Sequence, residues 1–264
     1  AKEIARSKEG MVEIFGDDGL VNVGNFRLGA YGEHKVIIPD DGPTNFDPHR
    51  LVLLPSYAFN EWIFFNSEIE YEHGGVDDTD GSQPANNSRF SGEVEVEQAW
   101  IDFKLIEQFN WRSLGVDLVP VGRINLYHEP TAFYSTERSE IYTNLIPSTW
   151  MENGTSVYGN IAEGLKYQFM VSQGLVEGPA GSGIGVTGLA GLRSARPELR
   201  DDRSSSLAYT ARLEFAPDFI PGLNGSASVH FSPDIQNPGS SVPGPSGAIP
   251  VTLHLHAVQR DGLP

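Results

Sequence analysis

Apolar and polar residues alternate along most of this chain of 264 residues. From Leu207 to Phe215 the apolar side chains hold every odd position, and the run from Trp62 to His73 follows a similar pattern. A period of two is typical of a β-strand with one apolar and one polar face. We therefore predict an all-β, antiparallel protein of about ten strands. The predicted strands cover residues 21–31, 50–59, 62–73, 93–105, 111–119, 155–160, 165–173, 206–215, 223–232 and 251–259.

The connections between these strands alternate in length. Short ones lie at 60–61, 106–110, 161–164, 216–222 and 260–262, and long ones at 32–49, 74–92, 120–154, 174–205 and 233–250. Tight turns at one end of a sheet and long loops at the other are typical of an up-and-down barrel of the bacterial outer membrane, whereas Greek-key sandwiches mix the two lengths. Aromatic residues near the short turns would form the interfacial girdle of such a barrel. They are Phe59, Trp62, Phe109, Trp111, Phe215 and Phe219.

Charge and composition exclude several other classes. The net charge of −17 disfavours nucleic acid, because a binding surface for phosphates needs Lys and Arg. The absence of Cys excludes disulfides, zinc-thiolate sites and a cysteine nucleophile. The longest apolar runs, such as Leu51 to Leu54, are too short for a membrane-spanning helix. A transmembrane β-barrel agrees with all three observations, since its strands alternate in polarity.

Three segments resemble porins of the phosphate-selective porin O/P superfamily. They read NEWIFFNSEIEYEHGG (60–75), GEVEVEQAWIDFKL (92–105) and PVGRINLYHEPTAFYSTERSEIYTNLIPSTWMENGTSVYG (120–159). The resemblance implies a barrel of about sixteen strands, often a homotrimer, through which small solutes or ions diffuse passively. It also implies the bacterial outer membrane as the location, with lipid and lipopolysaccharide as partners, and neither enzyme activity nor cofactors. Segment 120–154 would correspond to a loop folded into the lumen.

The chain departs from that family in two respects. It ends on the turn sequence Arg260-Asp261-Gly262 after about ten predicted strands. We therefore expect an incomplete barrel sequence, with residues 1–20 as an N-terminal periplasmic segment and 21–264 as the barrel; a closed ten-strand barrel is the alternative. The polar strand faces are also rich in acidic residues, so anion selectivity is not carried over.

Charged residues of the loop 120–154 are the candidates for a pore constriction: Arg123, His128, Glu129, Glu137, Arg138 and Glu140. Mixed charge in a constriction orients permeating solutes and sets selectivity. The same residues could form salt bridges that hold the loop against the wall, and both roles are compatible. The predicted lumen-facing residues are Glu68, Glu70, Glu72, Asp117, Lys166, Arg212 and Glu214.

Two soluble alternatives remain open. His254 and His256 would point to the same side of one strand, and His230 lies on the polar face of the strand before it. Such imidazoles can hold a transition metal in a β-barrel enzyme, although the sequence places no carboxylate partner. The other alternative is a β-sandwich that binds glycans through exposed aromatic residues. Its candidates are Trp62, Trp111 and Trp150.

Overall fold

The computed structural model describes residues 6–7, 10–13, 21–74, 92–133, 135, 137–139, 141–177, 184–187, 191–197, 199, 206–234, 246–248 and 251–252. The strands are β1 (Arg6–Ser7), β2 (Gly10–Glu13), β3 (Val21–Val23), β4 (Phe26–Ile37), β5 (Asn45–Ala58), β6 (Ile63–Glu72), β7 (Val94–Ile106), β8 (Phe109–Leu118), β9 (Met151–Ala162), β10 (Leu165–Gln173), β11 (Leu207–Phe215), β12 (Gly225–Asp234), β13 (Ser246–Ala248) and β14 (Val251–Thr252). Three short helical segments are η1 (Pro130–Ala132), η2 (Ile141–Leu145) and η3 (Arg193–Ala195).

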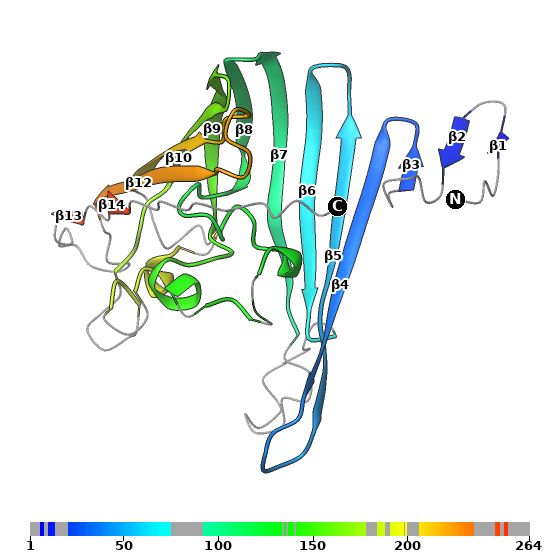
Figure 1. The fold of residues 1–264 in the computed structure, drawn as a ribbon, viewed down its shortest axis with the longest axis vertical. Helices are drawn as coiled ribbons and strands as arrows, with labels where there is room; N and C mark the ends of the chain where they lie inside the picture. The colour runs from blue at the N-terminus through cyan, green and yellow to red at the C-terminus, as the bar shows by residue number, and fades with distance from the viewer. Residues whose placement is uncertain are drawn as a thin grey trace. The chain divides into compact units, whose positions relative to one another are not determined.

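The strand order in the sheet follows the chain order from β1 to β13, and β14 pairs with β12 (Figure 1). The all-β, up-and-down, antiparallel prediction is confirmed in the described residues. The chain divides within β7 into two compact units, Ala1–Ala99 and Trp100–Pro264. None of the helical segments in the described residues is long and apolar enough to cross a membrane.

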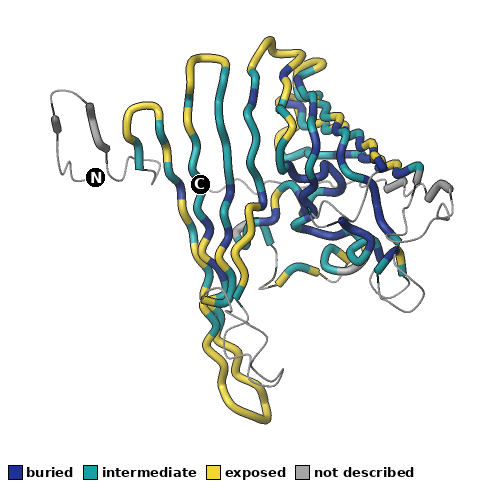
Figure 2. Tube along the Cα trace, turned by 180° about the vertical axis from the view of Figure 1, so that it is seen from behind, coloured by how far each residue is buried: buried dark blue, intermediate teal, exposed yellow. Residues whose placement is uncertain are grey.

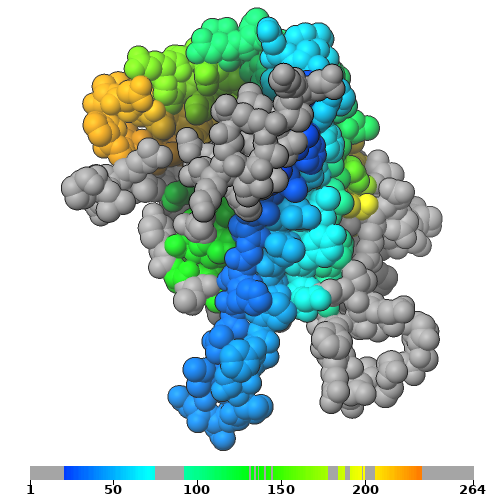
Figure 3. All heavy atoms as spheres, turned by 90° about the vertical axis from the view of Figure 1, so that its right-hand side faces the viewer, coloured from blue at the N-terminus to red at the C-terminus, as the bar shows by residue number. Residues whose placement is uncertain are grey.

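In the first unit, the β4–β5 hairpin is longer than the sequence predicts. The turn after β3 contains Gly24 in the left-handed region (φ 58°), so the predicted strand 21–31 is two strands. β4 and β5 pair from Phe26–Tyr57 to Ile37–Asn45, and the predicted loop 32–49 is therefore largely strand. Side chains near this turn are mostly exposed (Figure 2), and the hairpin end projects from the sheet in Figure 3.

The other edge of β5 pairs with β6 from Arg50–Glu72 to Ala58–Phe64. The predicted short link after β5 is confirmed, because the Asn60 side-chain oxygen accepts hydrogen bonds from the backbone N–H groups of Trp62 and Ile63. This arrangement closes the turn locally. Strand pairing also reaches into the predicted N-terminal segment 1–20, where β2 pairs with β3.

In the second unit, β8 to β12 form a series of antiparallel neighbours. β9 begins at Met151, so the predicted loop 120–154 ends at Trp150 and the predicted strand 155–160 is extended at its N-terminal end. In β8 the register with β9 shifts between Arg112 and Gly115. The shift places an extra residue in β8, which is the property of a β-bulge.

The burial of β11 is the reverse of that in a soluble sheet. Its apolar side chains Leu207, Tyr209, Leu213 and Phe215 are 39–52% exposed, whereas Arg212 is 5% exposed. β12 follows the same rule: Ser226, Ser228, His230 and Ser232 are buried, and Val229 and Phe231 are exposed. The polar face of these strands therefore points inward and the apolar face outward.

The buried polar residues of β7 change parity along the strand. Glu97 is buried on the odd parity, and Asp102 is buried on the even parity.

Candidate functional site

The candidate site is the polar face of β9–β12 with the two segments that cover it, 119–150 and 174–197. The first segment is closed at its base by Asn125, which is 1% exposed. The Asn125 amide nitrogen donates to the carbonyl oxygens of Val119 (2.7 Å) and Trp150 (2.9 Å), and its oxygen accepts from the Trp150 N–H (2.6 Å). One side chain thus joins the start of the segment to its end.

Backbone groups of Gly122 attach this segment to the sheet. Its N–H donates to Ser228 Oγ at 3.1 Å, and its carbonyl oxygen accepts from Arg212 Nη1 at 2.5 Å. Arg212 also contacts Glu214 at 3.1 Å. Small and charged polar side chains of β11 and β12 therefore satisfy loop backbone that would otherwise be buried without partners.

The second segment is attached to the sheet and to the first segment. The Leu175 N–H donates to Ser232 Oγ at 3.0 Å, and the Gly174 N–H donates to the Ser206 carbonyl oxygen at 2.9 Å. Arg196 Nη1 donates to the Thr149 carbonyl oxygen at 2.7 Å. The two segments therefore form one layer over the polar face.

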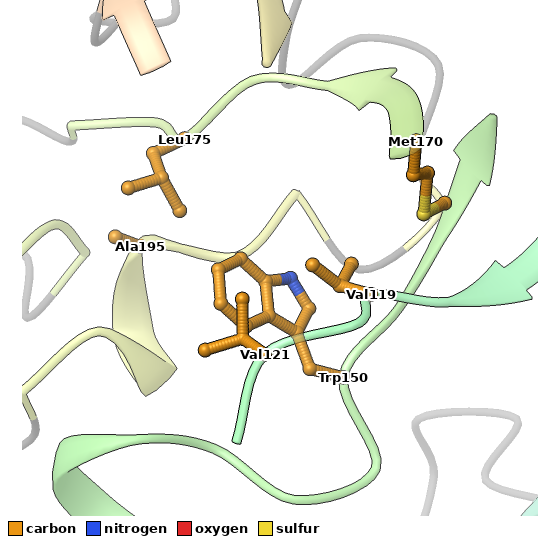
Figure 4. Packing of buried hydrophobic residues seen from close by; sticks show 6 residues of the cluster. All are labelled: Val119, Val121, Trp150, Met170, Leu175 and Ala195. Carbon is orange, nitrogen blue, oxygen red and sulfur yellow. The ribbon is translucent and has the colours of Figure 1, made fainter. Parts of the chain in front are cut away.

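A small apolar cluster lies between these segments and the sheet (Figure 4). It comprises Val119, Val121, Trp150, Met170, Leu175 and Ala195. Met170 comes from β10, and the other five come from the two covering segments. Burial of these side chains adds a hydrophobic contribution to the hydrogen bonds that hold the layer.

The predicted constriction residues have different positions in this layer. His128 is buried, with Nδ1 3.1 Å from the Asn125 carbonyl oxygen, and Arg138 Nη2 donates to the His128 carbonyl oxygen at 3.3 Å. Arg123 and Glu129 are half-buried and Glu137 is exposed. Glu140 lies outside the described residues. Arg138 thus contacts the backbone of its own segment, and the salt bridges that would hold the loop against the wall stay a prediction.

Two tyrosines of the first segment remain neutral at ordinary pH. Burial raises the pKa of the Tyr127 hydroxyl, and the nearby Glu214 carboxylate acts in the same direction. Burial likewise raises the pKa of Tyr142. Both phenols can therefore serve as neutral hydrogen-bonding groups on the surface of the layer.

The predicted lumen-facing residues lie on the same parity as the buried polar groups of their strands. In the second unit, Asp117 and Arg212 are buried, Glu214 is half-buried, and Lys166 is exposed opposite Glu214 in the β10–β11 register. In the first unit, Glu68 and Glu70 are buried and Glu72 is half-buried.

The acidic residues of β6 have polar partners. Glu68 accepts a hydrogen bond from the Gln98 amide, and Glu70 forms an ion pair with Arg50 at 2.8 Å. The negative charge of these predicted lumen-facing residues is therefore compensated in part by neighbouring side chains.

A charged cluster of four residues was missed by the sequence analysis except for Asp117. Its members are Asp102, Lys104, Arg112 and Asp117. Arg112 Nη1 donates to both oxygens of Asp117, at 2.8 and 3.1 Å, and Lys104 contacts Asp102 at 2.8 Å. The Arg112 guanidinium lies 4.6 Å from the Trp100 ring centroid and 5.0 Å from that of Tyr158. The Tyr158 hydroxyl donates to Asp102 at 2.8 Å.

The bulge in β8 makes this cluster possible. Residues 112 and 117 are five apart, and in a regular strand they would face opposite sides of the sheet. The extra residue between Arg112 and Gly115 restores them to the same side. The sequence signal for this bulge is a change in parity of the apolar residues, from odd at Trp111 to even at Leu114 and Val116. We predicted 111–119 as a regular strand and missed it.

The histidines of the predicted metal site are described only in part. His230 is buried, its Nδ1 lies 2.8 Å from Thr210 Oγ1, and its ring centroid is 4.8 Å from that of Trp150. His254 and His256 lie outside the described residues. The grouping of these three side chains stays a prediction.

The three tryptophans proposed for glycan binding are not equivalent. Trp62 is 47% exposed and Trp111 is 39% exposed, but Trp150 is 1% exposed. Trp150 instead packs in the apolar cluster and donates its ring N–H to Glu152 at 3.0 Å. Its prediction as an exposed glycan contact is wrong, because the two segments cover it.

Among known protein families, no family model matches the chain. The chain is 36% identical over 190 residues to a protein of Aquifex aeolicus (strain VF5) that carries only the description "Uncharacterized protein". The match includes 71% of this chain and 40% of the relative, so the chain spans less than half of the relative's length.

Proposed function

We propose that this chain forms the wall of an outer-membrane β-barrel channel through which small solutes or ions diffuse passively. The observation that carries the proposal is the reversed burial of β11 and β12. Leu207, Leu213 and Phe231 face outward, whereas Arg212 and His230 face inward. In water this arrangement would be unfavourable, because burying a Leu or Phe side chain contributes about 1.5–3 kcal/mol. In lipid the same outward face is favourable.

Strand lengths and pairing support the same proposal. β8 to β12 contain 9 to 12 residues each. A tilted strand needs about 9–11 residues to cross the hydrocarbon layer. Closure of the sheet, at the roughly sixteen strands that the resemblance to porins implies, would leave no unpaired backbone in lipid. Outer-membrane lipid, lipopolysaccharide and a homotrimeric assembly are parts of the same proposal.

The segments 119–150 and 174–197 would narrow the lumen. They lie on the polar face of β9–β12, where their backbone N–H groups donate to Ser228 and Ser232 and a backbone carbonyl accepts from Arg212. In a closed barrel the polar face is the lumen side. A fixed layer there reduces the cross-section for diffusion and brings charged side chains close to the solute.

Single-channel recording in planar bilayers tests this proposal. Replacement of residues 130–146 by a short Gly/Ser linker retains Asn125 and Trp150, and it should raise the conductance of the full-length protein. A matched replacement of 218–220, in a short turn, should leave the conductance unchanged. Absence of any conductance in the wild-type protein would refute the channel, and equal conductance of wild type and the 130–146 variant would refute the constriction.

The polar faces also lead us to expect a preference for cations. The fully buried carboxylates, six in the described residues, outnumber the three buried guanidinium groups. They are Glu68, Glu70, Glu97, Asp102, Asp117 and Glu152, against Arg50, Arg196 and Arg212. Excess negative charge along a pore attracts cations and repels anions. The reversal potential in a KCl gradient should have the sign of K⁺ selectivity, and the opposite sign would contradict this expectation.

A further inference from the structure

Two histidines and one aspartate meet in the first unit. Asp47 and His49 are two residues apart on β5 and share a face, and His73 follows β6 directly. His49 Nδ1 lies 2.9 Å from Asp47 Oδ2, and His73 Nδ1 lies 2.9 Å from Asp47 Oδ1. Each oxygen of one carboxylate therefore has its own imidazole.

The backbone holds His73 in this position. Its N–H donates to the His49 carbonyl oxygen at 3.0 Å, and its φ of 50° lies in the left-handed region, which is uncommon for a residue other than glycine. The two imidazole rings are in edge contact, with centroids 5.1 Å apart. The side chain of Asp47 is 15% exposed, that of His49 16%, and that of His73 40%. The group is thus ordered by the fold and reachable from solvent.

This donor set is one that divalent transition-metal ions prefer. Imidazole nitrogens and a carboxylate oxygen bind Zn²⁺, Co²⁺ and Ni²⁺, whereas Ca²⁺ and Mg²⁺ require mostly oxygen ligands. One ligand atom from each of the three residues lies within 4.8 Å of the others. Ligands at about 2.0–2.1 Å from a tetrahedral Zn²⁺ are roughly 3.3 Å apart, so small side-chain movements would suffice.

We propose that Asp47, His49 and His73 bind a divalent transition-metal ion, with water completing its coordination. The ion would link the β4–β5 hairpin to the residue that follows β6, joining positions 26 residues apart in the sequence. The proposal does not depend on the channel, because it concerns residues of the first unit only.

Two neighbouring positively charged side chains determine which nitrogen of His49 can bind the metal ion. Lys35 Nζ lies 2.9 Å and Arg50 Nη2 3.1 Å from His49 Nε2. Both groups are donors only, so His49 Nε2 accepts and its Nδ1 carries the proton that is directed at Asp47. Ligation through His49 Nδ1 therefore moves this proton to Nε2, and the contacts to Lys35 and Arg50 are lost.

Lys35 and Arg50 also have carboxylate partners, which they can keep when the contacts to His49 are lost. Glu33 lies 3.7 Å from Lys35 and 3.0 Å from Arg50, and Glu70 lies 2.8 Å from Arg50. Metal binding at His49 Nδ1 requires the proton on Nε2, whereas the Lys35 contact requires Nε2 without a proton. The metal ion and Lys35 therefore compete through the tautomer of His49. Removal of the Lys35 ammonium should therefore strengthen metal binding rather than weaken it.

Titration of the full-length protein in detergent, after treatment with a chelator, tests the proposal. Calorimetry with Zn²⁺ and visible absorption with Co²⁺ should show one saturable site. His49→Ala and His73→Ala should each weaken binding at least about tenfold. Lys35→Met should tighten it, and His34→Ala, which changes an exposed histidine of β4 outside the group, should have no effect.

Several results would overturn the site. They are the absence of saturable binding to the wild-type protein, affinity that is unchanged in both His49→Ala and His73→Ala, or a Lys35→Met variant that binds no more tightly than wild type. The far-ultraviolet circular dichroism spectrum of each variant reports whether it is folded. If His49→Ala does not fold, His73→Ala carries the test, because His73 is the most exposed member of the group.

Discussion

At the scale of single residues, Asn125 joins the two ends of the first covering segment of the candidate site. Its amide group makes three hydrogen bonds to the backbone of Val119 and Trp150, all buried. Among uncharged side chains, only the carboxamides of Asn and Gln combine an NH2 donor pair with a carbonyl acceptor. Replacement by a smaller residue leaves the buried Trp150 N–H without its acceptor, whereas the Val119 and Trp150 carbonyl oxygens still accept from the Val121 and Val119 N–H groups. An unsatisfied buried donor costs more than the loss of a bond exposed to water.

Asn125→Ala should therefore lower the free energy of unfolding by about 2 kcal/mol or more. Denaturant unfolding of the detergent-solubilised protein measures this change. The matched control is Asn160→Ala, which removes one long exposed contact of 3.4 Å to Glu107 and should change stability by less than about 0.5 kcal/mol. Equal effects of the two substitutions would show that Asn125 does not brace the loop.

At the scale of elements, the bulge in β8 decides which side chains of that strand meet. It brings Arg112 and Asp117 to the same face and leaves Leu114 77% exposed on the other. Ser156 of β9 also donates to Asp117 at 2.9 Å. A strand without the extra residue would place one member of the ion pair on the apolar face.

Deletion of Leu114 tests this role of the bulge. The deletion should move Arg112 or Asp117 to the apolar face. In the proposed barrel this face contacts lipid, where a charged residue costs up to about 2–4 kcal/mol near the bilayer centre. We expect loss of the heat-modifiable folded band on a denaturing gel. Leu114→Ala retains the number of residues and should fold normally. A deletion variant as stable as Leu114→Ala would contradict the assigned role.

At the scale of the whole molecule, our proposal of a membrane barrel depends on the reversed burial of β11 and β12. An exposed Leu on a soluble protein tolerates replacement by Arg, whereas a lipid-facing Leu does not. Leu213 is 49% exposed on the apolar face of β11. The polar neighbours Arg212 and Glu214 lie on the other face.

Leu213→Arg should accordingly destabilise the protein in lipid by about 2–4 kcal/mol. Folding into vesicles at increasing denaturant concentration measures this difference. Glu163→Arg, in the exposed turn between β9 and β10, is the matched control and should be nearly neutral. A neutral Leu213→Arg variant, or a wild-type protein that stays in solution without detergent, would refute the membrane location.

Most strands could be predicted from the sequence because their signal is local. Alternation in 206–215 and 223–232 identifies β11 and β12 and the parity of their polar faces. The predictions were less accurate where local signals are ambiguous. Gly24 splits the first predicted strand, and residues 32–37 and 45–49, predicted as loop, extend the β4–β5 hairpin. Strand pairing over these residues outweighs their weak alternation.

The sequence by itself determined the all-β class and, in regular strands such as β11 and β12, the face on which the polar side chains lie, since a period of two is a property of neighbouring residues. The alternation of short and long connections predicted the order of the strands. Only the tertiary structure decided which of these side chains meet. Asn125 with Trp150, Arg212 with Gly122, and Asp47 with His73 are contacts between positions 25, 90 and 26 residues apart. Such contacts depend on register, on a bulge and on the path of two loops, and alternation carries no information about any of these.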